Sequence, residues 1–200
     1  MLSVRDLANP VLGPVSLEVA AGECVAVMGA SGAGKSLLLR AIADLDPNVG
    51  DVALNGVTRN ALPAPEWRRQ VALVPAESGW WADSVNEHFI AAPPDMKLLE
   101  ALGLAAESLD WSVARLSSGE KHRLAILRAL SLRPKALLLD EPSASLDETA
   151  TGRLEAVLQD QRAAGVPVVL VTHDAAQAKR LAARLITMAD GRITDQRDAK

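Results

Sequence analysis

A glycine-rich stretch between a short apolar segment and a helix-forming segment constrains this chain most. Its residues are Gly29, Ala30, Ser31, Gly32, Ala33, Gly34, Lys35 and Ser36. Glycines let the backbone turn sharply, so that successive N–H groups point at one anion. A helix beginning at the lysine adds the positive end of its dipole. An ordinary glycine-rich turn has no use for this combination, and the stretch predicts a phosphate loop.

In a phosphate loop the lysine and the serine have separate tasks. Lys35 would neutralise the β- and γ-phosphate oxygens of a nucleoside triphosphate, and the Ser36 hydroxyl would bind Mg²⁺. The predicted nucleotide site covers the whole stretch together with Leu37. The predicted cofactors are therefore ATP and Mg²⁺.

Short apolar runs alternate with helix-period segments along the rest of the chain, which is typical of a layered α/β domain. Because the phosphate loop follows a strand, we predict an α/β fold with a P-loop NTPase core and a layered mixed sheet. The expected strands are 2–7, 15–19, 24–28, 51–54, 71–74, 136–140, 166–172, 184–188 and 192–194. The expected helices are 35–43, 118–131, 148–163 and 174–182.

Residues 77–115 differ in texture from their surroundings, since they are rich in tryptophan and proline and show no strand pattern. We predict that they form a small helical subdomain inserted into the core. The chain would then be one domain, 1–200, with a nucleotide-binding core made of 1–76 and 116–195. Residues 196–200 are expected to form a frayed tail.

Composition narrows the class of protein. Apolar residues make up 49% of the 200 residues, with one Phe, four Trp and no Tyr, so the core must be mainly aliphatic. No apolar run reaches the ~18 residues of a membrane span, and no signal peptide is evident. A formal charge of -4 argues against a nucleic-acid partner. Cys24 is the single cysteine, which excludes an internal disulfide and suggests a reducing, cytoplasmic compartment.

Two carboxylates follow the apolar run 136–139. Asp140 ends the predicted strand, where a carboxylate is costly unless it serves an ion or a hydrogen-bond network. It could orient the Mg²⁺ bound to Ser36, and Glu141 could polarise a water that attacks the γ-phosphate. Without the phosphate loop, the two acids could simply be polar residues at the end of a strand, before a turn. Their combination with a phosphate loop favours catalysis.

A second helix start lies before these acids, at Ser117, Ser118, Gly119 and Glu120. It offers N–H donors and a dipole end to a phosphate, although an isolated match would be no more than an ordinary N-cap. With the phosphate loop and the acid pair at these spacings, residues 2–195 resemble the ATP-binding cassette (ABC) ATPases, the motor subunits of membrane transporters.

The resemblance implies further roles. In that family the segment 116–120 is the signature, which completes the phosphate site of a second subunit, so a head-to-tail homodimer with two ATP molecules at its interface is implied. Residues 143–147 resemble the family's interface loop. His173 resembles its switch histidine, which hydrogen-bonds the γ-phosphate and the attacking water. The predicted catalytic residues are Glu141, His173 and Lys35.

The chain departs from the family pattern at two places. Ala76 stands where a magnesium-sensing glutamine is usual, and we predict that Glu77 takes over as a metal contact. Residues 9–12 offer no aromatic side chain to stack on adenine, which predicts a loss of roughly 1–2 kcal/mol of binding energy and a looser base preference.

A transmembrane permease subunit is the implied partner. Trp80 and Trp81 fall in the stretch that receives a permease helix in the family, where they would be anchors, although packing within the subdomain is an equal alternative. The protein would then sit on the cytoplasmic face of the inner membrane. The segment 116–148 resembles more narrowly the small bacterial exporters, including putative iron exporters.

Other functions compete with this one. The main alternative is a soluble, nucleotide-dependent regulatory cassette with little or no hydrolysis, which Ala76 and the missing aromatic favour and the acid and histidine oppose. A cassette of DNA repair or translation usually has two cassettes or long insertions. A small-molecule kinase would have no use for the signature.

Overall fold

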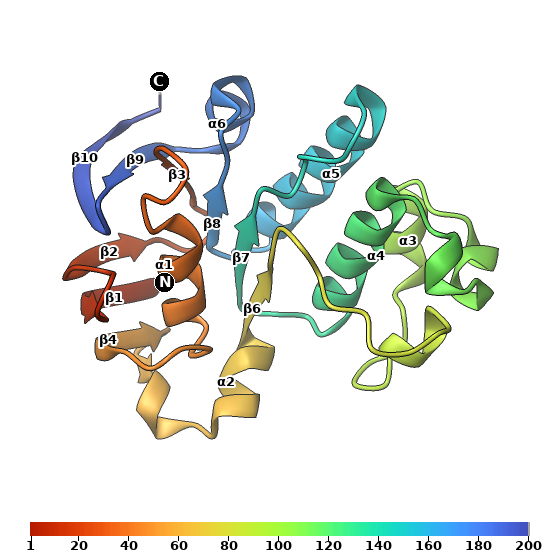
Figure 1. Ribbon diagram of the computed structural model, residues 1–200, viewed down its shortest axis with the longest axis horizontal. Coiled ribbons are helices and arrows are strands. Elements are labelled where there is room, and N and C mark those ends of the chain that lie inside the picture. The colour runs from red at the N-terminus through yellow and green to blue at the C-terminus, as the bar shows by residue number, and fades with distance from the viewer. Residues whose placement is uncertain (200) are drawn as a thin grey trace.

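Two sheets and the helices around them form the protein, a computed structural model that describes residues 1–199 (Figure 1). The strands are β1 Leu2–Ala8, β2 Val15–Val19, β3 Cys24–Met28, β4 Val49–Leu54, β5 Val57–Thr58, β6 Val71–Val74, β7 Ala136–Asp140, β8 Val168–Val171, β9 Arg184–Ala189 and β10 Arg192–Asp198. The α-helices are α1 Lys35–Ile42, α2 Ala64–Gln70, α3 Met96–Ala101, α4 Ser118–Ser131, α5 Glu148–Ala163 and α6 Ala175–Leu181. Short 3-10 turns cover Arg59–Ala61, Asn86–His88, Ala106–Asp110 and Val113–Arg115.

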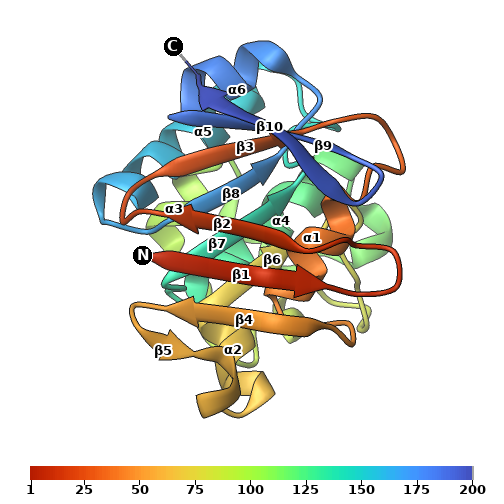
Figure 2. The same cartoon turned by 90° about the vertical axis from the view of Figure 1, so that its left-hand side faces the viewer.

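The larger sheet has the strand order β10-β9-β3-β8-β7-β6, and its neighbours from β9 to β6 run parallel. Strands buried on both faces must be apolar throughout, and all five residues of β7 are buried. The smaller sheet is antiparallel, with the order β2-β1-β4-β5. Along β2 buried and exposed residues alternate, as expected for a sheet that faces solvent on one side. Figure 2 shows this sheet in front of the parallel strands.

The helices form two layers on the larger sheet. Helix α1 lies between the two sheets, whereas α4 and α5 lie on the opposite side of the larger sheet (Figure 1). Two clusters of buried aliphatic side chains follow this division: one joins α1 to both sheets, and the other joins α4, α5 and α6 to the larger sheet. The α1 layer places the phosphate loop at the edge of the larger sheet.

Helix α3 and the turns around it lie at the end of the molecule farthest from the smaller sheet (Figure 1). Arg123 on α4 ties this segment down, since its guanidinium donates hydrogen bonds to the carbonyls of Leu102 and Gly103 at 3.0 Å. The segment corresponds to the stretch 77–115, for which a helical subdomain is predicted.

The predicted tail is wrong for residues 196–198. They continue β10, where Gln196, Arg197 and Asp198 pair with β9, and the N–H of Ala199 donates to the carbonyl of Ala183. The unpaired edge of β9 explains the extension, because backbone groups at an edge gain partners when the chain runs back along it. Lys200, the last residue of the predicted tail, lies outside the described residues.

Candidate functional site

The parallel strands β3, β8, β7 and β6 end at the same edge of the larger sheet. Their registers match there, because Val27 and Asp140 both pair with Val171 while Leu139 pairs with Val74. The loops that follow enclose a cavity of about 490 Å³. Its lining joins most of the predicted nucleotide site to both predicted catalytic side chains of the later loops: Gly29, Ser31, Gly32, Ala33, Gly34, Lys35, Ser36, Leu37, Ala76, Asp140, Glu141 and His173.

Glycines of the phosphate loop adopt backbone conformations that other residues avoid. Gly34 has φ +95° and precedes the first residue of α1. Gly29 has φ +149°, and a Cβ there would collide with the carbonyl oxygen of Met188. The Lys35 ammonium donates to the carbonyls of Gly29 at 2.8 Å and Ala30 at 2.9 Å. The loop therefore folds around the cation that it presents to the cavity.

Asp140 is a buried carboxylate in the same cavity, only 7% exposed. Within residues 1–199 its carboxylate forms no ion pair or hydrogen bond. An ionised carboxylate in this position is costly unless a cation compensates it. The Ser36 hydroxyl lines the same cavity, so an oxygen pair of the kind that Mg²⁺ prefers is in place. The residues present therefore fit a magnesium ion.

Glu141 and His173 form a close pair. The Nδ1 of His173 lies 2.6 Å from Oε2 of Glu141, and the histidine side chain is 74% exposed against 21% for the glutamate. Glu141 has φ +50°, which is uncommon outside glycine, and its N–H donates to the carbonyl of Val171 at 2.9 Å. That left-handed turn lets the chain leave β7 while the carboxylate remains at the cavity, which is the kind of strain that functional sites retain.

The signature residues lie elsewhere. Ser117 caps α4 through a capping box: its hydroxyl accepts from the N–H of Glu120 at 3.2 Å, and the glutamate accepts from the N–H of Ser117 at 2.9 Å. The hydrogen bonds from the hydroxyl and then the backbone N–H of Ser117 lower the pKa of Glu120. A Cβ on Gly119 would lie 3.0 Å from the carbonyl oxygen of Ser145, so the signature packs against the interface loop.

None of the predicted signature residues lines the phosphate cavity of its own chain. Ser118 lines a second cavity of about 440 Å³, together with Glu77, Lys121 and Ser145. Ala76 lines both cavities. The structure therefore separates Glu77, predicted as a metal contact, from Asp140 and Ser36, and Glu77 as a ligand stays a prediction.

A family model described as ABC transporter matches residues 12–144. This chain belongs to the ABC transporter family. The protein named aliphatic sulfonates import ATP-binding protein SsuB, from Albidiferax ferrireducens, is 36% identical over 96% of this chain and 70% of its own length. The cobalt import ATP-binding protein CbiO of Rhodobacter capsulatus is 39% identical over 91% of this chain and 71% of its own. A solved ATP-binding subunit of an ABC transporter superposes with a TM-score of 0.88 at 29% identity, over 99% of this chain and 90% of its own.

As an ABC ATPase, the chain binds and hydrolyses ATP and powers a permease that is a separate chain. The main interpretation of the sequence is thus confirmed over that of a regulatory cassette without hydrolysis. The narrower resemblance to small exporters is not what these relatives' names indicate, since both are named import proteins. No helix in the described part of the chain is long and apolar enough to cross a membrane.

The sequence analysis did not predict a buried polar network that lies beside the loop after Glu141. Gln177 is 0% exposed; its amide oxygen accepts from the Ser143 hydroxyl at 3.2 Å, and its amide nitrogen lies 3.5 Å from Oε1 of Glu155. Arg180 donates to both oxygens of Glu155 at 2.8 and 2.7 Å. The network joins the loop after Glu141 to the helix after His173. No local pattern signals this network, because Gln177 lies on α6 and its partners lie on α5 and in the loop after β7.

The turn at residues 9–12 offers no aromatic side chain on which adenine could stack. Within residues 9–12, Asn9 folds the turn by accepting hydrogen bonds from the N–H groups of Val11 and Leu12 at 2.9 and 2.7 Å. Leu12 is fully buried, whereas Val11 is 63% exposed. An aliphatic side chain is therefore what this turn offers to a flat ring.

Proposed function

We propose that the phosphate cavity of this ABC ATPase binds Mg²⁺ and ATP, and that its residues act as the sequence predicts. Lys35 and the N–H groups of the phosphate loop hold the β- and γ-phosphates, while Ser36 and Asp140 hold the metal. Bound Mg²⁺ would neutralise charge on the phosphates. The unpartnered, buried carboxylate of Asp140 supports this assignment.

Glu141 is proposed to accept a proton from the attacking water. A base must be within hydrogen-bond reach of the water, and Glu141 lines the cavity into which the γ-phosphate would project. The contact of 2.6 Å with His173 supports the paired role, because it fixes the orientation of both side chains. His173 can then present its other ring nitrogen to the γ-phosphate.

We further propose that two copies assemble head to tail, so that residues 117–120 of one copy close the phosphate cavity of the other around ATP. The single observation that carries this proposal is the separation of the two sets of residues within one chain. The start of α4 offers N–H groups and a dipole end, which is what a γ-phosphate requires. Each ATP would hold the dimer together until hydrolysis.

The permease would dock beside Trp80 and Trp81, which places this subunit on the cytoplasmic face of the inner membrane without a span of its own. The transported substrate is not assigned, because similar relatives are named for substrates as different as aliphatic sulfonates and cobalt. No part of the proposal involves nucleic acid.

The testing experiment is ATP-driven dimerisation of Glu141→Gln, measured by light scattering on a sizing column. We expect a dimer with ATP and a monomer without it, because binding is retained while hydrolysis is removed. Lys35→Ala in the same background is the control and should remain monomeric with ATP. A Glu141→Gln protein that binds ATP and stays monomeric would contradict the head-to-tail proposal.

A further inference from the structure

The second cavity, of about 440 Å³, adjoins the phosphate cavity, since Ala76 lines both. Its walls come from two parts of the chain: the segment 76–80 after β6 on one side, and the first turns of α4 with the interface loop on the other. The described side chains that line it include one acid, Glu77, and one lysine, Lys121. A charged ligand of either sign would therefore meet a like charge in this cavity.

Two buried polar atoms, one from each wall, have no hydrogen-bond partner among the described residues: Oγ of Ser78 and Nε2 of His122. His122 is only 6% exposed, and burial lowers its pKa, so the ring is neutral near pH 7. Both atoms are shielded from solvent. Because a buried polar group without a partner destabilises a protein, both atoms gain from a rearrangement that supplies one.

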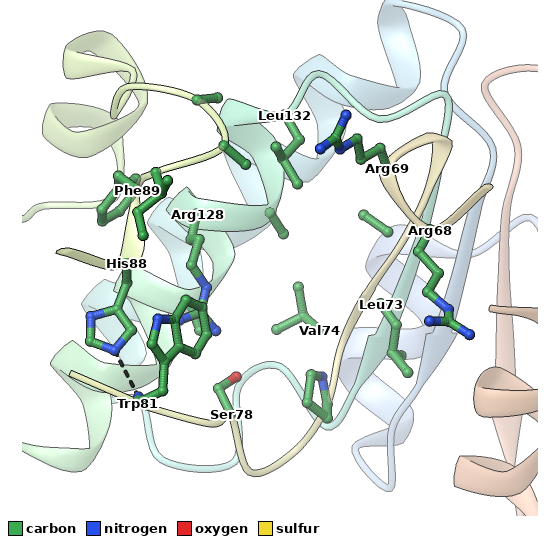
Figure 3. A pocket seen from close by; sticks show the side chains of 17 residues that line it. Arg68, Arg69, Leu73, Val74, Ser78, Trp81, His88, Phe89, Arg128 and Leu132 are labelled. Atoms are coloured by element: carbon green, nitrogen blue, oxygen red, sulfur yellow. Dashed lines mark hydrogen bonds between the residues drawn. The ribbon is translucent and has the colours of Figure 1, made fainter. Parts of the chain in front are cut away.

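The two groups can satisfy one another. The Nε2 of a neutral imidazole accepts a hydrogen bond in one tautomer and donates one in the other, and a serine hydroxyl can do either. Figure 3 shows Ser78 in the segment that leads from Val74 of β6 to Trp81, across the groove from Arg128 on α4. The hydroxyl and the imidazole thus belong to the two elements that this segment connects.

The segment that carries Ser78 is weakly held. No backbone group of residues 76–78 forms a hydrogen bond within the described part of the chain. Before it, Val74 pairs with β7, and beyond it the carbonyl of Gly79 accepts a hydrogen bond from Arg128 on α4 at 3.2 Å. A short rearrangement of this segment can therefore bring the two unpartnered atoms together while both of its ends stay in place.

ATP would act on both walls of the cavity. The segment after β6 borders the phosphate cavity of its own chain through Ala76. Ser118, at the start of α4, lines the other wall and would face the ATP held by the second copy of the proposed dimer. Closure of the dimer around two ATP molecules thus acts on the two walls at once, and it can narrow the cavity between them.

We propose that Ser78 and His122 form a hydrogen bond in the ATP-closed dimer and not in the free subunit. The inference rests on the proposed function, to which it adds a contact inside each subunit. His122 is then a positioning residue: through Ser78 it fixes the segment that borders one ATP against the helix that holds the other. The bond stabilises the closed state, since it pairs two groups that have no partner before closure.

The dissociation constant of the ATP-bound dimer tests the proposal, measured by sedimentation equilibrium on Glu141→Gln protein with saturating ATP. Ser78→Ala and His122→Leu should each raise it about 25-fold, because an average hydrogen bond is worth about fivefold and the dimer contains two. The double variant should be no weaker than either single variant. Ser78→Thr keeps the hydroxyl and His122→Gln places an amide near the position of Nε2, so both should retain most of the affinity.

Unfolding of the free subunit in urea separates this role from a structural one. Both atoms lack a partner in that state, so Ser78→Ala should leave the urea midpoint unchanged, and the effects of Ser78→Ala and His122→Leu on it should add. Ser112→Ala, at an exposed serine, is the matched control and should leave both the midpoint and the dimer unchanged.

A dimer that forms with ATP and is unaffected by Ser78→Ala would overturn this inference alone. So would effects that multiply in the double variant, or a coupling already present in the free subunit, since the contact would then exist without ATP. If His122→Leu does not fold, Ser78→Ala against Ser78→Thr decides the question. A Glu141→Gln protein that stays monomeric with ATP would overturn the head-to-tail dimer and this inference with it.

Discussion

Replacing the buried Gln177 by glutamate, which has the same shape but carries a carboxylate, should destabilise the fold. Gln177→Glu would put a carboxylate oxygen where the amide nitrogen lies 3.5 Å from Glu155. At an effective dielectric constant of about 20 the repulsion at this separation is about 5 kcal/mol. The Arg180 guanidinium, already paired with Glu155, offsets part of it, which leaves a destabilisation of about 2–4 kcal/mol above neutral pH.

The cost should depend on pH in a definite direction. Burial and the neighbouring carboxylate would raise the pKa of the introduced carboxyl in the folded state above its value of about 4.3 in the unfolded chain. The protein can avoid the repulsion by protonating it, so the penalty is small near pH 4–5 and grows as pH rises through the raised pKa. The variant should therefore be close to the unchanged protein at about pH 5 and far less stable at about pH 8.

Urea unfolding at both pH values measures this difference, with Gln196→Glu on the exposed strand β10 as the matched control. The hydrolysis rate should fall with the stability at high pH, because Gln177 also fixes Ser143, two residues from Glu141. ATP binding should change little, since no network residue lines the phosphate cavity. An equal loss at both pH values, or none at either, would refute the reasoning.

Three further outcomes follow from particular contacts. Gly119→Ala should weaken ATP-driven dimerisation on a sizing column, because its methyl group would lie 3.0 Å from a backbone oxygen of the interface loop. Gly152→Ala, in open space on α5, is the control and should raise the free energy of unfolding in urea by about 0.5–1 kcal/mol. Hydrogen bonds from the N-cap lower the pKa of Glu120, so its charge contributes stability that is lost as pH falls. Glu120→Gln should cost about 0.5 kcal/mol at pH 7, and progressively less as pH falls below about 4.3, the pKa of a free glutamate. Burial raises the pKa of the Cys24 thiol to about 12, so thiol reagents at pH 8 should label it only after unfolding.

The parts of the fold that could be predicted from sequence are those in which one strong local signal dominates. Helices α4 and α5 begin and end at the predicted residues, because Ser117 and Asp147 cap them and their side chains accept from the backbone of the first turn. The buried strands β3 and β7 also match, since continuous aliphatic runs have few other solutions.

The parts that sequence reasoning missed depend on distant partners. Helix α2 was not expected, because its seven residues are too few to show a clear helical period. It is held by Trp67, which is fully buried and donates to the carbonyl of Ile42 at 3.0 Å. The last residues of β10 form a strand only because they pair with the edge strand β9. The site was predicted where motif residues share a sheet edge, but the Gln177 network depends on the packing of α5 against α6, which no local pattern encodes.

A substitution at Glu77 tests whether this residue contacts magnesium when the dimer closes. It lines the cavity beside the signature, one residue from Ala76, which lines both cavities. As a magnesium contact it can act only if the segment after β6 turns toward Asp140 when the dimer closes. Glu77→Gln should then raise the Mg²⁺ concentration for half-maximal hydrolysis roughly tenfold, the lower end of the effect for an outer partner of a metal. Binding of ATP with Mg²⁺ to the monomer should be unchanged, because in this state the Glu77 carboxylate lies outside the phosphate cavity. An unchanged magnesium dependence of hydrolysis would exclude Glu77 as the replacement for the glutamine and would leave magnesium to Ser36, Asp140 and the phosphates.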